Sequence, residues 1–514
     1  MKVKFVAALL AGSAFVISAP AFGQDAPAQE APEPTDPDPS DAAADAAIAN
    51  SQPVDDAAAK IELLQQQVEA LQASIEQIKT QQAKVTPSWK GAPLYEDKEA
   101  GWSFKPKGLL QYDAGYVGFP NGDERRGTVN GVNFANLGWN TRARRLTIGA
   151  DGTIPGGFRY SAEFNFAQSQ VDFVDVLLAY DFKKAPLTAQ IGYFYPFSSL
   201  ETMTSSKYTS FMERAGITDA FSHNRRIGAA LIANDKVSDK WLLQGGIFSE
   251  EMNQESFNRT GWIASARAVF SPTIGAARLH LGANFAHRTN KKEAMGRQYR
   301  VRPMTQITDV RFADTGTLAA KGDDIVGLEV AAILKRFHVA AEAQKVWVRD
   351  AFSQAEINAI NADLTTNDTP SGTALNGNPS FWGGYLEAGF YLTGETRAYK
   401  GGSFGRVKVL RPFTDGGWGA FQINGRVDYV DLSDDVASGS ASLLAPFYVN
   451  GGKQTALQLS GIWNPTDYVR FMAQYSHINV TGGPRNGLSD DLSDAINKRE
   501  FDSDVFTMRA QLDF

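Results

Sequence analysis

The end of the chain alternates strictly between apolar and polar side chains. Its apolar positions are Phe506, Met508, Ala510, Leu512 and Phe514, and its polar positions are Thr507, Arg509, Gln511 and Asp513. Successive side chains of a β-strand point to opposite faces, so this pattern predicts a strand with one apolar and one polar face. The same alternation recurs within 421–429, 279–285 and 160–166. The region 100–514 is therefore predicted to be all-β.

Segments of this character are spaced along the whole region. The strands predicted from them are 109–117, 142–151, 157–167, 172–181, 187–194, 225–233, 240–248, 261–270, 277–287, 325–334, 337–347, 384–393, 417–430, 455–464, 467–478 and 503–514. The segment 404–412 is either one further strand or a strand within a loop. Strands of about ten residues with an apolar, aromatic-rich face are typical of outer-membrane barrels, which contain an even number of strands.

Two further features distinguish a membrane barrel from a soluble sandwich, whose strands also alternate. Aromatic residues stand at many strand ends, as in the interfacial girdles of membrane proteins; they include Trp102, Trp241, Trp262, Tyr429 and Trp463. The chain also begins with two lysines, a short apolar run and small residues, the composition of a secretory signal peptide. Because lipid does not tolerate open sheet edges, we predict a closed transmembrane antiparallel β-barrel of about 16 strands in a Gram-negative outer membrane.

Three segments precede the predicted barrel. Residues 1–23 form the signal peptide, and residues 24–56, rich in Pro, Ala and Asp, are predicted to be a disordered linker. Residues 57–85 are predicted to form a short α-helical coiled coil in the periplasm, because apolar residues recur every seven positions. These heptad positions are Ile61, Val68 and Ile75 in one series and Leu64, Leu71 and Ile78 in the other. A single amphipathic helix packed on the barrel is the alternative.

Composition and charge exclude several classes of function. The chain has no Cys and five His, and it lacks the spacings typical of a zinc site, a nucleotide-binding loop or a serine hydrolase. We therefore expect no enzyme, no metal site and no cofactor. The net charge of -7 comes from the N-terminal segments, since 45 basic and 45 acidic residues balance over 90–514. This balance gives no support to nucleic-acid binding.

The candidate binding residues are arginines on the inward parity of the predicted strands. A charged side chain that faces lipid at mid-depth costs about 2–4 kcal/mol, so these arginines are expected to face the lumen. The pore-lining candidates are Arg145, Arg159, Arg226, Arg278, Arg426 and Arg509, and Arg267, Arg288 and Arg470 share their parity. As a ladder, their guanidiniums would bind the oxygens of permeating anions. Alternatively, they pair with inward acids and line a merely polar pore; these acids are Glu163, Glu329, Glu342, Glu387 and Asp428.

A long segment, 195–224, separates two predicted strands. A loop of this size that folds inward narrows a barrel pore, and Lys207, Glu213 and Arg214 would then lie near the constriction. An ordinary surface loop is the alternative interpretation.

Several long stretches resemble the family of phosphate-selective porins O and P. They are RRLTIGADG (144–152), PFSSLETMTSSKYTSFMER (196–214), NRRIGAAL (224–231), RVRPMTQITDVRFADTG (300–316), YLTGETRAY (391–399) and RAQLDF (509–514). The resemblance spans 104–514 and implies a homotrimeric outer-membrane channel of sixteen strands, whose loop after the fifth strand folds inward. It also implies selectivity for phosphate or other anions. In GYFYPF (192–197), Tyr195 stands where the family pattern has Lys, which argues against phosphate specificity if that Lys lines the constriction.

Taken together, the sequence predicts a water-filled channel in contact with outer-membrane lipid, through which small anions, including phosphate or polyphosphate, diffuse passively. Two alternatives stay open. One is a general, non-selective porin. The other is a structural envelope protein that tethers the outer membrane to the cell wall through its periplasmic coiled coil.

Overall fold

The computed structural model of the chain describes 53–85, 88–89, 91–119, 128–129, 132–133, 137–167, 171–249, 259–363, 365–434, 449–483 and 500–514. The expected signal peptide and nearly all of the expected linker lie outside these residues. The described chain divides into an N-terminal helix and a large β-structure, and each is described by itself.

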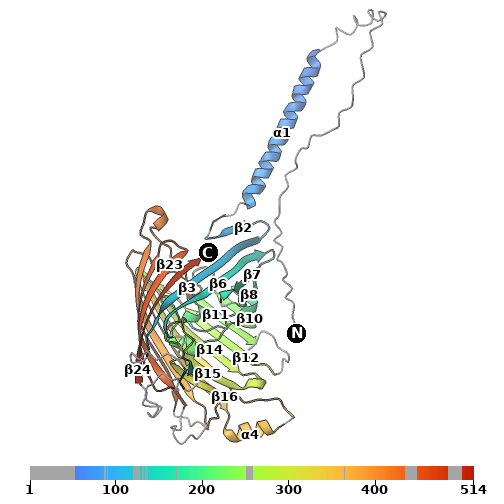
Figure 1. Cartoon of the computed structure of the whole chain (residues 1–514). Helices are drawn as coiled ribbons and strands as arrows, with labels where there is room; N and C mark the ends of the chain where they lie inside the picture. The colour runs from blue at the N-terminus through green and yellow to red at the C-terminus, as the bar shows by residue number, and fades with distance from the viewer. Residues whose placement is uncertain are drawn as a thin grey trace, which may run out of the picture. The chain divides into compact units, whose positions relative to one another are not determined.

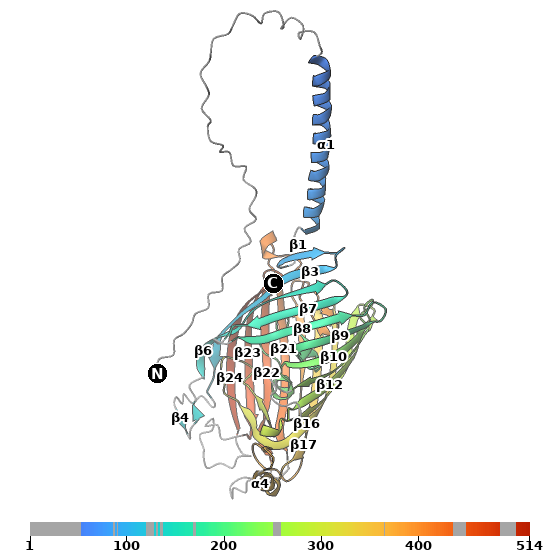
Figure 2. The same cartoon turned by 90° about the vertical axis from the view of Figure 1, so that its right-hand side faces the viewer.

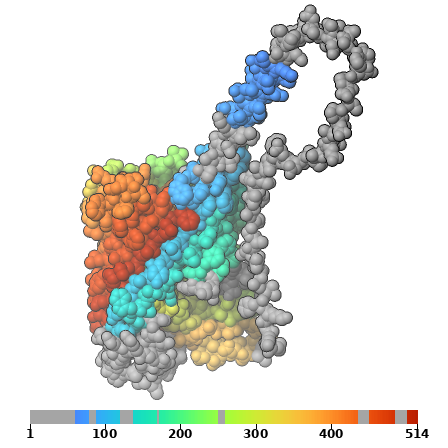
Figure 3. Space-filling model, turned by 45° about the horizontal axis from the view of Figure 1, so that its top comes forward, coloured from blue at the N-terminus to red at the C-terminus, as the bar shows by residue number. Residues whose placement is uncertain are grey.

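The large unit is a closed antiparallel barrel of sixteen strands. In chain order they are β3 (Trp102–Val117), β6 (Gly138–Ile154), β7 (Phe158–Asn165), β8 (Asp172–Asp181), β9 (Leu187–Phe194), β10 (Arg226–Asn234), β11 (Trp241–Ser249), β12 (Trp262–Phe270), β14 (Ala277–Thr289), β16 (Ala313–Leu334), β17 (Phe337–Ala351), β18 (Ser380–Tyr391), β21 (Ala420–Asp434), β22 (Val449–Asn464), β23 (Val469–Thr481) and β24 (Glu500–Asp513). Each pairs with the next, and β24 pairs with β3 to close the wall (Figures 1 and 3).

Each of the sixteen predicted segments falls on one of these strands, so the predicted fold is confirmed. The bounds differ most at β16, which begins at Ala313 rather than 325 and pairs with the additional strand β15 (Gly296–Val301) before it joins the wall. The segment 404–412 is not a wall strand. Only its first residue is in a strand, β20 (Ser403–Phe404), which forms a small separate hairpin with β19 (Tyr399–Lys400).

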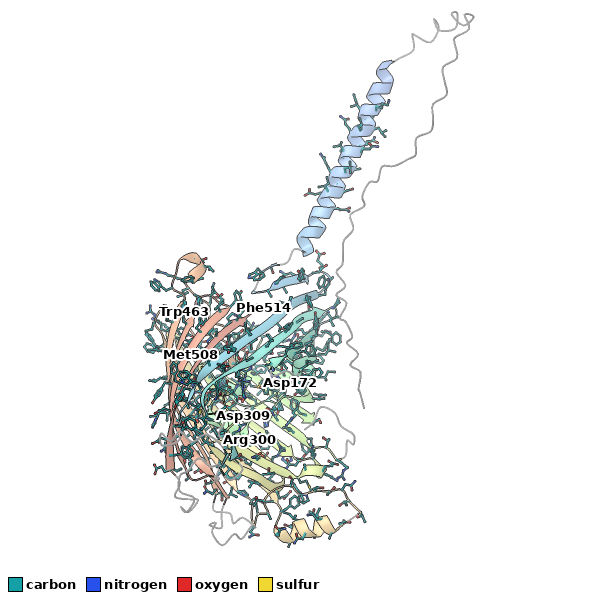
Figure 4. All side chains as sticks on the ribbon, viewed as in Figure 1. Asp172, Arg300, Asp309, Trp463, Met508 and Phe514 are labelled. Atoms are coloured by element: carbon teal, nitrogen blue, oxygen red, sulfur yellow. The ribbon has the colours of Figure 1, made fainter. Side chains whose placement is uncertain are left out.

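The two faces of the wall have the character that the alternation predicts. On β24 the side chains of Phe506, Met508 and Leu512 are exposed on the outer face, whereas Thr507 and Arg509 are buried on the lumen side. Apolar outer faces are required by contact with lipid. Figure 4 places Met508 along β24, and Phe514 and Trp463 near one end of the barrel.

Aromatic side chains gather at that end. The ring of Trp463 stacks on Phe421 and Phe471 of the neighbouring strands, with centroid distances of 5.9 and 5.5 Å. The opposite end carries the pair Trp382 and Tyr429, 5.1 Å apart. Amphipathic rings prefer the boundary between lipid tails and headgroups. The barrel therefore has aromatic residues at both membrane boundaries.

Smaller elements complete the structure. The short strands are β1 (Ser88–Trp89), β2 (Pro93–Asp97), β4 (Thr128–Val129), β5 (Val132–Asn133) and β13 (Thr273–Ile274), and the helices after the first are α2 (Leu200–Met203), α3 (Gly216–Phe221), η3 (Lys292–Ala294), α4 (Gln354–Ala362) and η4 (Phe413–Asp415). The wall strands β7, β8, β9 and β10 follow one another and span only 8–10 residues each (Figure 2).

Three connecting segments contribute to the core inside the barrel, together with a larger number of wall residues. These segments are 195–225, 290–312 and 392–419, the last of which includes the β19–β20 hairpin. Ile217 and Phe221 of the first segment and Tyr299 of the second belong to one buried cluster with the wall residues Val346 and Phe381. The apolar core of the protein therefore lies inside the barrel, between these segments and one side of the wall.

The N-terminal helix, α1, runs from Pro53 to Val85. It begins four residues before the helix predicted over 57–85, with Pro at the first helical position, where its missing N–H is not needed. The heptad side chains of Ile61, Leu64, Val68 and Leu71 are each at least 50% exposed, and the side chain of Ile78 lies outside the described residues. The coiled coil therefore stays a prediction. Among the described helices, none is long and apolar enough to cross a membrane.

Candidate functional site

Residues 195–225, which we call the constriction segment, leave the wall after β9 and cross the lumen. Ser199 caps α2 by accepting a hydrogen bond from the backbone N–H of Thr202. Further along, the backbone N–H of Met212 donates to Gln474 of β23 at 2.9 Å. The segment therefore leaves the wall after β9, crosses the lumen and is held by β23 on the far side of the barrel.

A buried ionic cluster forms its first anchor. Glu201 Oε1 and Glu387 Oε2, the latter on β18, each lie 2.6 Å from Arg426 Nη2 on β21. Glu201 Oε2 accepts from the backbone N–H of Ala215 at 2.7 Å. The side chain of Arg426 is only 1% exposed. Because the guanidinium is buried between two carboxylates, Arg426 holds the segment and does not face a permeating ion.

A second anchor lies near β24. Arg509 donates to both carboxylate oxygens of Asp113 on β3, at 2.6 and 2.7 Å, and to Glu213 of the constriction segment at 2.7 Å. Glu213 also receives two hydrogen bonds from Arg144, at 2.9 and 3.1 Å. Burial raises the pKa of Glu213, but Arg144 and Arg509 outweigh it and hold this pKa well below its usual range. Glu213 is therefore a carboxylate at neutral pH.

The segment also approaches the wall very closely at Gly216. The backbone N–H of Gly216 donates to Asp428 on β21 at 2.9 Å. A Cβ atom at this position would lie 2.7 Å from Val430 Cγ2 and 2.8 Å from Asp428 Oδ1. The absence of a side chain is what allows this contact.

A cavity of about 970 Å³ remains between the constriction segment, the wall from β3 to β11 and the inward segment 290–312. Among the described residues that line it, cationic side chains outnumber acidic ones by ten to five. The cations are Arg144, Arg145, Lys207, Arg214, Arg225, Arg288, Arg297, Arg300, Arg302 and Arg311, and the acids are Glu163, Asp172, Asp175, Glu213 and Asp219. Figure 4 labels Asp172 and Arg300 from this lining. The excess positive charge favours anions within the cavity.

A β-bulge brings two adjacent arginines into this lining. Gln111 of β3 pairs with Arg145 and Tyr112 pairs with Ala143, so Arg144 is the extra residue of β6. A bulge interrupts the strict alternation of faces. As a result Arg144 reaches Glu213, while Arg145 donates to Gln111 at 2.6 Å, and both line the cavity.

Four of the lining cations have no carboxylate within ion-pair distance in the described part of the chain. They are Arg145, Lys207, Arg214 and Arg300. Arg214 bonds instead to three backbone carbonyl oxygens of 201–204, at 3.0–3.2 Å. Neutral partners leave the positive charge uncompensated. These four side chains are therefore the best candidates to attract an anion.

Positive charges are also crowded at the loops of the cavity. Burial, together with the nearby charges of Arg302 and Arg300, lowers the pKa of Arg311 to about 10 against the opposing attraction of Asp219. Asp219 is shared, since it lies 3.2 Å from both Arg302 and Arg311. Two guanidiniums therefore share one carboxylate at this place.

The structure separates the residues predicted from sequence into two groups. Arg145, Lys207, Glu213 and Arg214 line the cavity together. The other pore-lining candidates lie elsewhere. Arg426 and Arg509 are buried behind the constriction segment. At strand ends, Arg159 pairs with Asp181 and Arg278 bonds to Asp239, whereas half-buried Arg226 begins β10 outside the lining. The second interpretation of the sequence, pairing with inward acids, describes Arg426 with Glu387 and Arg267 with Glu329.

The sequence interpretation missed six of the ten cations of the lining, among them Arg225 at the end of the constriction segment. Arg297, Arg300, Arg302 and Arg311 come from the inward segment 290–312, which it did not place in the lumen. The closely spaced arginines of RVRPMTQITDVRF (300–312) were the available signal, since such a density of charge has little reason to occur in an ordinary connection. Arg144 depends on the bulge, which has no sequence signature here.

Comparison with known proteins identifies the chain. The family model described as phosphate-selective porin O and P matches residues 117–514. The chain belongs to this family. Family membership and the closed barrel show that the protein is a porin of the outer membrane and that its lumen is a channel.

Two relatives and one solved structure are similar to this chain. An uncharacterized protein of Caulobacter vibrioides is 33% identical over 439 residues, which cover 83% of this chain and 77% of the relative. Porin O of Pseudomonas aeruginosa is 26% identical over 438 residues, or 79% of this porin and 89% of the relative. Among solved structures, the anion-selective porin from Comamonas acidovorans matches with a TM-score of 0.42 and 10% identity, covering 80% of this chain and 100% of that one.

Within the described residues, no group of three or more His, Cys, Asp or Glu side chains is placed to hold a metal ion.

Proposed function

We propose that this porin is an anion-preferring channel through which phosphate or polyphosphate diffuses passively. The observation that carries the proposal is the cavity lining, in which ten cationic side chains face five acidic ones among the described residues. A water-filled passage with one sign of excess charge concentrates the opposite ion and repels its own.

The chemistry of the lining supports oxyanions in particular. Nine of the ten cations are arginines, and a guanidinium donates two parallel hydrogen bonds to a pair of oxygen atoms. Arg145 and Arg214 have neutral partners in the described part of the chain and keep donors for such an anion. Although Tyr195 stands in place of the expected Lys, positive charge remains at this position, because Arg214 and Arg225 lie beside it.

Ion selectivity is tested by reversal potential. Purified protein in a planar bilayer under a potassium chloride gradient should give a reversal potential that is displaced from zero toward the equilibrium potential of chloride. Arg145→Gln should shift it toward zero, whereas Arg159→Gln, at an exposed strand end, should leave it unchanged. A cation-selective or unselective pore would reject anion preference.

Phosphate preference needs a separate measurement. If phosphate binds in the lining, it should reduce chloride current at concentrations well below that of chloride, and sulfate should do the same. A chloride current that ignores both oxyanions, in a pore that still prefers anions, would leave a general anion porin and reject the specific proposal.

We further propose that the chain acts as a homotrimer and that α1 associates with copies of itself. The row of apolar heptad side chains that α1 exposes supports self-association of the helix, because covering such a row removes it from water. Replacing Leu64 and Leu71 by Glu should abolish cross-linking between helices. Deleting 24–89 distinguishes a tether from a transport element: damaged envelope integrity with unchanged conductance would favour the tether.

A further inference from the structure

Tyr195 has a distinctive position in the cavity. It directly follows β9, lines the cavity and is half-buried. The guanidinium carbon of Arg225 lies 4.2 Å from the centre of its ring, and that of Arg214 lies 5.7 Å from the same point. Cations at these distances are attracted to the face of an aromatic ring. The ring of Tyr195 therefore interacts with two of the cations that line the cavity.

Both arginines are held in place by other contacts. Arg225 Nε and Nη2 donate to the two carboxylate oxygens of Asp175 on β8, at 2.8 and 3.4 Å. Arg214 donates three hydrogen bonds to backbone carbonyl oxygens of 201–204. A guanidinium carries five N–H groups, so each arginine keeps donors beyond these contacts. A phenol oxygen and a permeating oxyanion would compete for these donors.

The charges around Tyr195 decide which form of the phenol is present. Burial by itself raises the pKa of Tyr195, but Arg225, Arg214 and Arg145 outweigh it and lower this pKa to about 7. The groups that face this site are Arg214 and Arg225 from its own segment, Arg145 from β6, Asp175 from β8 through Arg225, and Glu163 from β7 through the same guanidinium. His223 also lines the cavity, but burial and Arg288 lower its pKa well below its ordinary value, so it stays neutral near pH 7.

We propose that Tyr195 is a specificity-determining residue of the anion pathway. Its ring lies beside Arg214 and Arg225, and as a phenolate it opposes the binding of an oxyanion to these two arginines. The inference rests on the proposed anion conduction and refines it. A Lys at this position would add a permanent positive charge. Tyr195 instead makes the affinity of the pore for oxyanions depend on pH, because a negative charge is added beside the binding site as the pH rises.

The test measures block of chloride current by sulfate in planar bilayers. Sulfate is the probe because its charge, unlike that of phosphate, is constant near neutral pH. In the native porin the sulfate concentration for half block should rise about tenfold or more from about pH 6 to about pH 8.5, as expected for a unit charge a few ångströms from the anion. In Tyr195→Phe it should be independent of pH and equal to the native value at about pH 6.

Tyr208→Phe is the matched control. Tyr208 belongs to the same segment and also lies beside an arginine, with Arg406 5.5 Å from its ring, but it is absent from the lining of the large cavity. Burial raises its pKa, so its phenol stays protonated over this range. This variant should therefore keep the native pH dependence.

Each outcome decides the matter. Sulfate block that is constant with pH in the native porin, or that still varies in Tyr195→Phe, overturns the inference and leaves anion conduction standing. A native pore without anion preference at either pH overturns both. If Tyr195→Phe does not fold, near-ultraviolet titration of the native porin replaces it: one of the 16 tyrosines should ionise near pH 7, and none doing so overturns the inference.

Discussion

Replacing Arg426 by Met removes the cation that joins the constriction segment to the barrel wall. In the native chain Arg426 Nη2 lies 2.6 Å from a carboxylate oxygen of Glu201 and 2.6 Å from one of Glu387, and the side chain is 1% exposed. Removing one partner of a buried ion pair costs about 3–5 kcal/mol, because the remaining charge stays buried without compensation. Two carboxylates remain here, which favours the upper part of that range.

This free energy bears on the attachment of the segment. Since about 1.4 kcal/mol is a factor of ten in an equilibrium constant, the detached state should become about 10²- to 10⁴-fold more populated. In planar bilayers we expect larger and noisier single-channel currents, and in thermal unfolding of the purified barrel a lower midpoint. Adding Glu201→Gln removes one of the stranded carboxylates and should recover part of the loss.

Arg145→Gln provides the contrast, because Arg145 lines the cavity and bonds to the neutral Gln111. It should weaken oxyanion block without extra noise and without a change in the unfolding midpoint. If Arg426→Met instead gives a steady channel with an unchanged unfolding midpoint and weaker oxyanion block, Arg426 acts on the anion and does not anchor the constriction segment.

Three further substitutions examine other parts of the site. Arg300→Gln removes a cation without a carboxylate partner in the described chain and should lower the anion preference read from the reversal potential, with no loss of stability. Gly216→Ala should loosen the constriction segment by about 1–3 kcal/mol, seen as current noise, since its Cβ would lie 2.7 Å from Val430 Cγ2. Glu213 has a depressed pKa, so its contribution to holding the constriction segment against the wall is complete above about pH 4.5 and is lost as the pH falls further. The current should stay steady from neutral pH to about pH 4.5 and become noisy below it, whereas Glu213→Gln should be noisy throughout.

The sequence predicted the barrel well because lipid imposes one rule on every wall strand. An outer face such as Phe506, Met508 and Leu512 must be apolar, and the next side chain along the strand then faces water or protein. Strand ends were less well predicted, because that rule stops at the membrane boundary. The first third of β16 lies beyond it and pairs with β15, so its side chains no longer alternate in the same way.

The site was predicted less well, because inward parity does not say what fills the lumen. Arg145 and Arg426 have the same parity and the same chemistry in the sequence. In the structure one lines the cavity and the other is sealed beneath the constriction segment by Glu201 and Glu387. The difference is made by a segment more than two hundred residues away from Arg426, and no local pattern reports it.

The origin of the cavity's charge leads to a consequence for selectivity in this porin. Seven of the ten lining cations lie in the constriction segment or in the inward segment 290–312, and only Arg144, Arg145 and Arg288 belong to wall strands. Wall strands are constrained by pairing and by lipid, whereas inward segments are constrained mainly by their anchors. Exchanges within these segments that keep Glu201, Glu213 and Gly216 can therefore change the charge of the pathway while the barrel stays the same. Tyr195 is such a position, since it adjoins the wall but acts on Arg214 and Arg225 of the segment itself.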